Sequence, residues 1–117
     1  FLLDEKKNLL EFYNGIDFLV LPSHSESFPN VIAESMLCST PVLSSKAGCA
    51  EEIVLSKSFI MNKVDKKSIS KMLEKIIRLK LNNSFKWREI QKNSRAHIIK
   101  QYSVEKMMKN YLDTWTF

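Results

Sequence analysis

Short apolar runs separated by polar loops dominate the first half of the chain. Runs at 16–21, 41–44 and 59–61, apolar except for Asp17 and the terminal Ser44, predict three short strands, and Gly15 and Pro22 bound the first of them. A run that is apolar at successive positions is typical of a strand buried on both faces, as in a parallel sheet. The pattern therefore indicates parallel strands joined by helices.

Segments with helical spacing separate these runs. Helices are expected over residues 4–13, 30–39 and 50–55. In the first helix Leu9, Leu10 and Tyr13 fall on one side, so we expect all three to face the core. The Asn14-Gly15 pair should end that helix, because this dipeptide readily leaves the helical conformation.

The second half of the chain is helical in pattern throughout. Asp65 is a suitable N-cap for a first helix, whose apolar positions recur at helical spacing from Ile69 to Ile77. A second helix is expected over residues 84–101. Ser103 should cap a third helix, whose apolar face would consist of Val104, Met107, Met108, Tyr111, Leu112 and Trp115.

Strands that alternate with helices, followed by a helical tail, predict an α/β fold of the Rossmann type. With only three short strands, the sheet would have an unpaired edge that is normally covered. We therefore expect residues 1–62 to form the second half of a Rossmann-like domain and residues 63–117 to form a helical extension. The chain starts at Phe1 rather than Met, so we expect a fragment of a longer polypeptide that self-associates through the exposed edge.

Charge is divided unevenly along the 117 residues. The net charge is +5, yet residues 57–109 hold 15 basic and 4 acidic residues, for +11 against −6 elsewhere. The basic half could attract anionic lipid or nucleic acid, or could simply provide solvated helix faces. No apolar run approaches the roughly 20 residues needed to span a bilayer. We expect a cytoplasmic protein, with the inner face of the cell membrane as a peripheral location.

Neither the cysteines nor the histidines suggest a metal site. Cys38 and Cys49 lie in dissimilar contexts and are interpreted as reduced thiols, while His24 and His97 have no paired ligand spacing.

The helix that follows Pro29 carries one acid among apolar residues. At about 100° per residue, Glu34 points between Leu37 and Cys38. A carboxylate without partners would be costly there, so we expect donors from protein, water or ligand, unless Glu34 looks out through a gap in the packing. The first turn, at Pro29 and Asn30, would offer free N–H groups and the positive end of the helix dipole to a phosphate. Together these features describe a site for phosphate and ribose hydroxyls.

Three motifs, in the right order, resemble those of the family 4 retaining glycosyltransferases, which are glycogen-synthase-like enzymes. They are PSHSESFPNVIAESM at 22–36, TPVL at 40–43 and GCAEEIV at 48–54. The resemblance covers almost the whole chain and implies the C-terminal, nucleotide-sugar-binding part of a two-Rossmann-domain enzyme. That enzyme would transfer a sugar from a nucleoside-diphosphate donor to a glycan or lipid-linked acceptor, as in the synthesis of a bacterial capsule or lipopolysaccharide.

The resemblance assigns roles to individual residues. Glu34 matches the family's second glutamate, which holds the ribose hydroxyls of the donor nucleotide. Glu26 matches the first, which lies beside the donor sugar and is the implied catalytic residue; without the family, Glu26 would be interpreted as a loop carboxylate in water. The loop and helix start whose backbone amides meet the sugar and diphosphate are matched by Phe28, Pro29, Asn30 and Val31.

Retaining transfer in this family needs no obvious protein nucleophile. The resemblance implies front-face attack on an oxocarbenium-like centre, with the leaving diphosphate stabilised by positive groups and amide dipoles. It also implies that the reaction needs no metal ion and no cofactor, since the nucleotide-sugar is a co-substrate. The acceptor domain and the arginine-and-lysine pair for the diphosphate would precede Phe1, so the isolated chain is predicted to be inactive. Nucleic acid is not an expected partner.

Several residues depart from the family pattern or invite other roles. Ser27, Ser35, Ser39 and Cys49 stand where the family usually has Gly, Ala, Gly and Gly. Ser27 could crowd the donor sugar or add a hydrogen bond, and Ser39 would be unfavourable if this helix end requires a positive φ. Lys46 lies near the predicted site without an assigned role. Trp87 and Trp115 are expected to pack rather than to stack on sugars.

Two rival interpretations remain open. One is a non-catalytic remnant or interaction domain that keeps only the fold. The other is a nucleic-acid-binding module built on the basic helices, which lacks interleaved exposed aromatic residues and any known binding motif.

Overall fold

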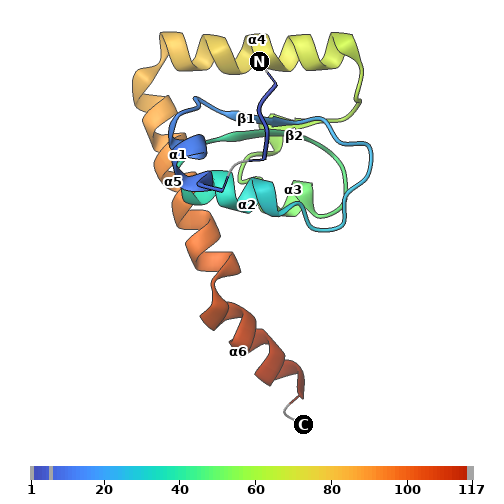
Figure 1. Cartoon of the computed structure of the whole chain (residues 1–117), viewed down its shortest axis with the longest axis vertical. Coiled ribbons are helices and arrows are strands. Elements are labelled where there is room, and N and C mark those ends of the chain that lie inside the picture. The colour runs from blue at the N-terminus through green and yellow to red at the C-terminus, as the bar shows by residue number, and fades with distance from the viewer. Residues whose placement is uncertain (1, 6, 116–117) are drawn as a thin grey trace.

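The computed structural model describes residues 2–5 and 7–115. Its extents are 50 × 31 × 28 Å, and the longest dimension comes from the last helix, which projects from an otherwise rounded body (Figure 1). None of the helices within the described part of the chain is long and apolar enough to cross a membrane.

Three parallel strands form the sheet, in the order β1-β2-β3. They are β1 (Leu19–Leu21), β2 (Val42–Ser45) and β3 (Ile60–Met61). Val20 lies opposite Leu43 on the central strand, and Ser44 lies opposite Ile60. The predicted α/β class, with three short parallel strands at the predicted places, is therefore confirmed.

The expectation that the first strand is buried on both faces and runs from residue 16 was wrong. Only Leu19, Val20 and Leu21 pair, and all three are half-buried. By contrast, every residue of β2 is buried, because β2 lies between two strands. Asp17, just before β1, is exposed and forms an ion pair with Lys80 instead of extending the strand.

Helices cover both faces of the sheet. The bounds are α1 (Leu9–Asn14), α2 (Asn30–Leu37), α3 (Ala50–Ile53), a 3₁₀ turn (Lys57–Phe59), α4 (Lys66–Asn82), α5 (Ser84–Tyr102) and α6 (Val104–Trp115). In Figure 1, α4 lies along one side of the strands and α2 and α3 lie on the other, while α5 passes along the edge of both layers. Ile32, Leu43, Ile53, Ile76 and Ile98 are at most 2% exposed and join these layers in one core.

The helix expected over residues 4–13 is shorter than predicted. It begins at Leu9, because the Asn8 side chain accepts a hydrogen bond from the Glu11 N–H at 3.3 Å and caps the first turn. It ends at Asn14 as expected. The prediction that Leu9 and Leu10 face the core was wrong, since both are exposed, whereas Tyr13 is buried as predicted.

The caps predicted for the helical half are present. The Asp65 carboxylate accepts from the Ser68 N–H at 2.8 Å, and this hydrogen bond lowers the pKa of that carboxyl. The Ser103 hydroxyl accepts from the Lys106 N–H at 3.2 Å and starts α6. Ile77 is exposed, so the apolar face of α4 toward the core is narrower than the sequence indicates.

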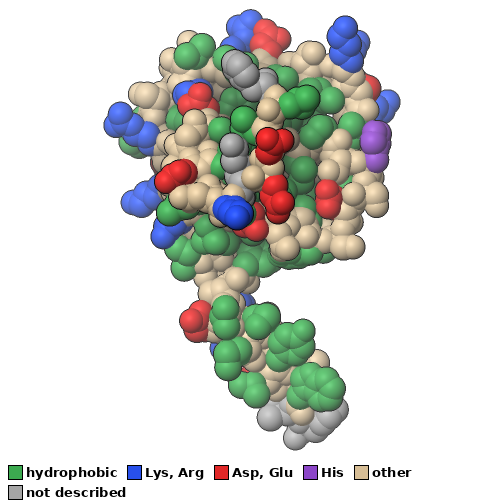
Figure 2. Space-filling view, in the orientation of Figure 1, with side chains coloured by type: hydrophobic (Ala, Val, Ile, Leu, Met, Phe, Trp, Pro, Cys, Tyr) green, Lys and Arg blue, Asp and Glu red, His purple; other side chains and the backbone are tan. Residues whose placement is uncertain are grey.

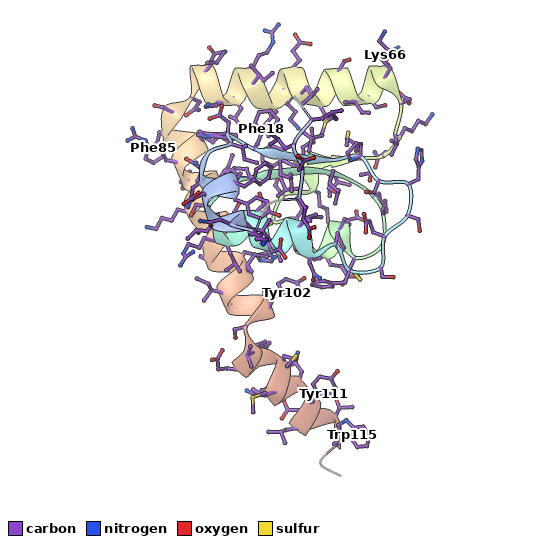
Figure 3. All side chains as sticks on the ribbon, in the orientation of Figure 1. Phe18, Lys66, Phe85, Tyr102, Tyr111 and Trp115 are labelled. Atoms are coloured by element: carbon purple, nitrogen blue, oxygen red, sulfur yellow. The ribbon has the colours of Figure 1, made fainter. Side chains whose placement is uncertain are left out.

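No residue of α6 is buried. Figure 2 shows apolar side chains gathered along this helix, in contrast to the mixed surface of the body. Trp87 is buried on α5, as predicted for a packing residue, whereas Trp115 is 73% exposed, so the same prediction is wrong for Trp115 within the described chain. Figure 3 places Tyr111 and Trp115 on α6 beyond Tyr102, which ends α5.

Ser39 terminates α2 with a left-handed backbone, at φ 61°. Its N–H bonds to the Met36 carbonyl at 3.0 Å, which satisfies one of the free carbonyls at the helix end. The condition under which serine is less favourable than glycine at this position is therefore met.

Candidate functional site

The loop between β1 and α2 is tied to the end of β2 at two carbonyl groups. The Ser45 hydroxyl donates to the Ser23 carbonyl at 2.5 Å, and the Cys49 N–H donates to the Ser27 carbonyl at 3.1 Å. Ser45 is buried at the end of its strand, so its hydroxyl has a fixed position. The loop that carries Glu26 thus has a conformation set by the neighbouring strand and the turn that follows it.

Gly48 allows this close approach of backbone segments. Its φ is 54°, and a Cβ placed there would lie 2.2 Å from the Glu26 carbonyl oxygen and 2.5 Å from that of Ser27. Both contacts are with backbone atoms that cannot rotate away, so only glycine fits without moving the loop. The third motif, which Gly48 begins, thus packs against the first motif, which contains Glu26 and Ser27.

Glu26 lies half-buried in this loop. The Ser23 hydroxyl donates to its Oε1 at 2.8 Å. Because a carboxylate oxygen can accept more than one hydrogen bond, this contact orients the group and leaves acceptor capacity for a ligand. The interpretation of Glu26 as a freely solvated loop carboxylate does not describe this geometry.

Glu34 is also half-buried, and its carboxylate contacts a residue of α1. The Tyr13 hydroxyl donates to its Oε2 at 3.0 Å, across 21 residues of sequence. Burial raises the pKa of Tyr13 to about 12, and the hydrogen bond to Glu34 and its negative charge act in the same direction. The expectation that this carboxylate has a hydrogen-bond donor is confirmed, and the donor is a protein side chain.

The start of α2 lies between Glu26, in the preceding loop, and Glu34, one turn further along the helix. Pro29 occupies the N-cap position and is buried, and no side chain caps this end of the helix. Asn30 and Val31, in the first turn, are both exposed. The Ile32 N–H of this turn donates to the Pro29 carbonyl at 3.0 Å, whereas Asn30 and Val31 place the positive dipole end of the helix at the surface, open to an anion from solvent.

Phe28 leads from the loop to the last turn of α5. Its ring packs edge-on against Tyr102, with centroids 5.9 Å apart. The Tyr102 hydroxyl reaches the Glu52 carbonyl on α3 at 3.3 Å, and burial raises the pKa of this phenol. Tyr102 therefore braces the loop against α3, a contact that helical periodicity could not indicate because it joins residues 50 apart.

Neither Lys46 nor the hollow between α2, α5 and α6 brings a free basic group to the two glutamates. Lys46 forms an ion pair with Glu51 at 3.0 Å, so the basic group near the loop is already neutralised within the described chain. A hollow of about 790 Å³ lies between the start of α2, the end of α5 and α6, and is lined by Phe28 and Asn30 but by neither glutamate. Phe28 and Asn30 thus face a space shared with α6, while Glu34 faces α1.

Comparison with known proteins identifies the family. The family model described as "Glycosyl transferases group 1" matches residues 1–101. The chain belongs to the group 1 glycosyl transferases. The resemblance to family 4 glycosyltransferases drawn from the three motifs is thereby confirmed.

Several curated glycosyltransferases are similar in sequence to part of this chain. A capsular polysaccharide biosynthesis glycosyltransferase of Staphylococcus aureus is 34% identical over 58% of this chain and 18% of its own length. A D-inositol 3-phosphate glycosyltransferase of Xylanimonas cellulosilytica is 39% identical over 44% of this chain and 12% of its own length. An uncharacterized glycosyltransferase of Methanocaldococcus jannaschii is 34% identical over 81% of this chain and 26% of its own length. The chain thus matches about a quarter or less of these relatives.

A solved structure has the same fold. The sucrose-phosphate synthase of Thermosynechococcus elongatus superposes with a TM-score of 0.71 at 23% identity, over 89% of this chain and 27% of that one. At this identity the likeness concerns the fold alone, and it agrees with the Rossmann-like arrangement of strands and helices described above.

The three motifs contain the candidate residues Glu26 and Glu34, but they did not predict the contact between Tyr13 and Glu34. Tyr13 was predicted only as a core residue, and its bond to Glu34 joins two helices that do not adjoin in sequence. The available signal is a tyrosine on the side of a short helix that is predicted to be buried, because a buried phenol usually finds a hydrogen-bond partner.

Proposed function

We propose that this chain supplies the donor-nucleotide part of a glycosyltransferase that moves a sugar from a nucleoside diphosphate to an acceptor with retention of configuration. The observation that carries the proposal is the position of the half-buried Glu34 carboxylate, which lies one turn inside α2 and accepts a hydrogen bond from the Tyr13 phenol. The first turn of the same helix has no side-chain cap. A carboxylate accepts from vicinal hydroxyls, and an uncapped helix start attracts phosphate. A nucleoside diphosphate carries both groups.

Each predicted site residue has a role in this proposal. Glu34 would hold the ribose hydroxyls, and Glu26, with one oxygen bound by Ser23, would contact the donor sugar beside the reacting carbon. The diphosphate and sugar would lie along the backbone from Phe28 to Val31, at the start of α2. The hydrogen bonds from Tyr13 to Glu34 and from Ser23 to Glu26 would hold both carboxylates in place before the donor binds. This would reduce the entropy cost of ordering the site.

The chemistry proposed is front-face displacement. The bond between the anomeric carbon and the diphosphate oxygen breaks as the acceptor oxygen approaches the same face. The acceptor proton moves to the departing diphosphate oxygen. Negative charge that develops on the diphosphate would be stabilised by the dipole and N–H groups of α2, together with positive groups supplied from elsewhere in the enzyme. No protein nucleophile, metal ion or cofactor enters this proposal.

The acceptor proposed is a glycan or a lipid-linked glycan, bound through a preceding domain, in the synthesis of a cell-surface polysaccharide. Support comes from the Staphylococcus relative, whose name assigns it to capsular polysaccharide biosynthesis. A lipid-linked acceptor would bring the enzyme to the inner face of the cell membrane, where the excess of +11 over residues 57–109 would favour anionic lipid.

Calorimetric titration of the protein, expressed from its whole coding sequence, with UDP, GDP and ADP tests the proposal. At least one should bind, and Glu34→Ala should weaken its binding by roughly tenfold or more, because a charged hydrogen-bond acceptor to the ribose is lost. Glu89→Ala, which removes an exposed acid on α5, is the matched control and should leave the affinity unchanged. Absence of nucleotide binding, or equal affinity in Glu34→Ala, would contradict the proposal.

A second candidate is an interaction domain that keeps the fold without catalysis. The observation that favours it is α6, which has no buried residue and presents Met107, Tyr111 and Trp115 to the solvent. The same titration separates the two functions, because an interaction domain without a donor site should bind none of UDP, GDP and ADP.

A further inference from the structure

The contact between α1 and α2 is built around Tyr13. This residue is the one buried member of α1, at 3% exposure, while its neighbours Leu9 and Leu10 are exposed. The Thr40 hydroxyl donates to the Tyr13 carbonyl at 2.8 Å. The position of Tyr13 is thus fixed at its backbone as well as at its phenol.

A closed set of hydrogen bonds links this residue to the helix that carries Glu34. Thr40, which binds the Tyr13 carbonyl, has its own carbonyl held by the Ser35 hydroxyl at 3.0 Å. Ser35 and Thr40 are both buried, and Ser35 adjoins Glu34 on α2. Both the backbone of Tyr13 and the base of the Glu34 side chain are therefore held in one frame, and the phenol closes that frame at Oε2.

We propose that Tyr13 is a positioning residue for the donor site: its phenol fixes one oxygen of the Glu34 carboxylate so that the other is aimed at the ribose hydroxyls. Tyr13 is the one hydrogen-bond donor that the described residues supply to this carboxylate. Without it the carboxylate could rotate, and orienting it would add to the cost of binding the nucleotide. The proposal rests on the function proposed above, since it presumes that Glu34 meets the ribose.

The phenol is suited to this role over a wide pH range. Its pKa is raised to about 12 by burial and by Glu34 itself, so the hydroxyl remains a donor at any physiological pH. A histidine in its place would change charge near neutral pH, and a lysine would hold its donor on a flexible chain. The tyrosine ring stays neutral and has few rotatable bonds.

The test compares a ribonucleoside diphosphate with its 2′,3′-dideoxy counterpart. The ligand is whichever of UDP, GDP and ADP binds best to the protein expressed from its whole coding sequence. Tyr13→Phe should lower the ratio of ribo to dideoxy affinity roughly tenfold, while the affinity for the dideoxy compound stays within about twofold. Phe12→Leu, which alters the ring packed edge-on against Tyr13 at 5.4 Å, should keep the wild-type ratio.

Four further results decide the interpretation. In a Glu34→Ala background, Tyr13→Phe should have no additional effect on the ratio, because the two residues act through one interaction. An unchanged ratio in Tyr13→Phe, with a reduced ratio in Glu34→Ala, overturns the positioning role and leaves the proposed function intact. An unchanged ratio in Glu34→Ala overturns both. Equal falls in Tyr13→Phe and Phe12→Leu would mean that only the docking of α1 matters, which also overturns the positioning role.

Discussion

Single residues hold the candidate site through short polar contacts rather than through a large apolar pocket. Glu26 is oriented by Ser23, Glu34 by Tyr13, and the loop between them by the backbone at Gly48. The Tyr13–Glu34 bond and the approach of Gly48 to the Glu26 carbonyl join segments that are distant in sequence, whereas Ser23 and Glu26 lie in one loop. Substitutions at these residues should therefore change ligand affinity and the free energy of unfolding to different extents, so the two effects can be measured separately.

Gly48→Ala should destabilise the protein and weaken nucleotide binding. The added Cβ would lie 2.2 Å from the Glu26 carbonyl oxygen, and the residue has a positive φ. The left-handed conformation alone costs a non-glycine residue about 1–2 kcal/mol, and movement of the loop adds to this. Urea unfolding measures the loss. Gly15→Ala, where the nearest atom is 3.2 Å away and φ is −87°, is the matched control and should cost less; equal costs would contradict the role of Gly48.

Tyr13 should make stability fall at high pH. Its pKa is about 12 in the folded protein against the ordinary tyrosine value of 10.0, so the unfolded chain loses this proton first. The contribution is complete below pH 10 and is lost as the pH rises from about 10 to about 12. Urea unfolding at pH 8.5 and at pH 10.5, about half a unit above the ordinary tyrosine value, should show a larger loss in wild type than in Tyr13→Phe. Parallel losses in the two proteins would exclude this linkage.

Elements differ in how well the sequence determines them. The caps at Asp65 and Ser103 and the bounds of α5 follow from local signals, and the structure agrees with them within about a residue. The length and burial of β1 do not, because they depend on its place at an edge, which no local pattern encodes. Leu9 and Leu10 show the same limit, since a helical stripe identifies a shared side without identifying what covers it.

The candidate site divides in the same way. Glu26 and Glu34 could be located from the motifs, whereas their donors Ser23 and Tyr13 could not be paired with them. Glu26 and Ser23 are near in sequence, but the spacing did not specify the bond. Glu34 and Tyr13 meet only when α1 and α2 pack together, so their contact is a tertiary result.

Removal of α6 should leave the fold of the body intact. Because α6 has no buried residue, truncation after Ser103 should change the free energy of unfolding by less than about 1 kcal/mol. Ile98→Ala, at a side chain 2% exposed on the preceding helix, should cost about 2–5 kcal/mol by opening a cavity. Chemical unfolding of the two variants makes the comparison, and a truncation as costly as Ile98→Ala would show that α6 is part of the core.

The whole molecule presents two surfaces that a monomer in water would be expected to cover. One consists of the two sheet edges, since among the described strands β1 and β3 each pair with β2 alone, and the other is the apolar face of α6. Unpaired strand edges and exposed apolar faces both favour association. The body itself is well packed, so association should occur without unfolding.

The 117-residue chain should therefore self-associate in a concentration-dependent manner. Sedimentation velocity over a dilution series should show the average mass rising with concentration. The variant truncated after Ser103 should associate more weakly but still measurably, because the edge of β1 remains. A monomer at every concentration would contradict the prediction, and complete loss of association on truncation would assign it to α6 alone.

The left-handed backbone at Ser39 bears on how this sequence would change under selection. The motif resemblance implies glycine at positions 27, 39 and 49. Within the described chain Ser39 is the non-glycine residue with positive φ, while Cys49 has φ −82°. Ser39→Gly would remove a strain of about 1–2 kcal/mol, partly offset by greater freedom of the unfolded chain. In a library of variants selected by heat, glycine should accumulate at position 39 and not at position 49. A departure from the family consensus can thus be a reserve of stability at one position and neutral at another.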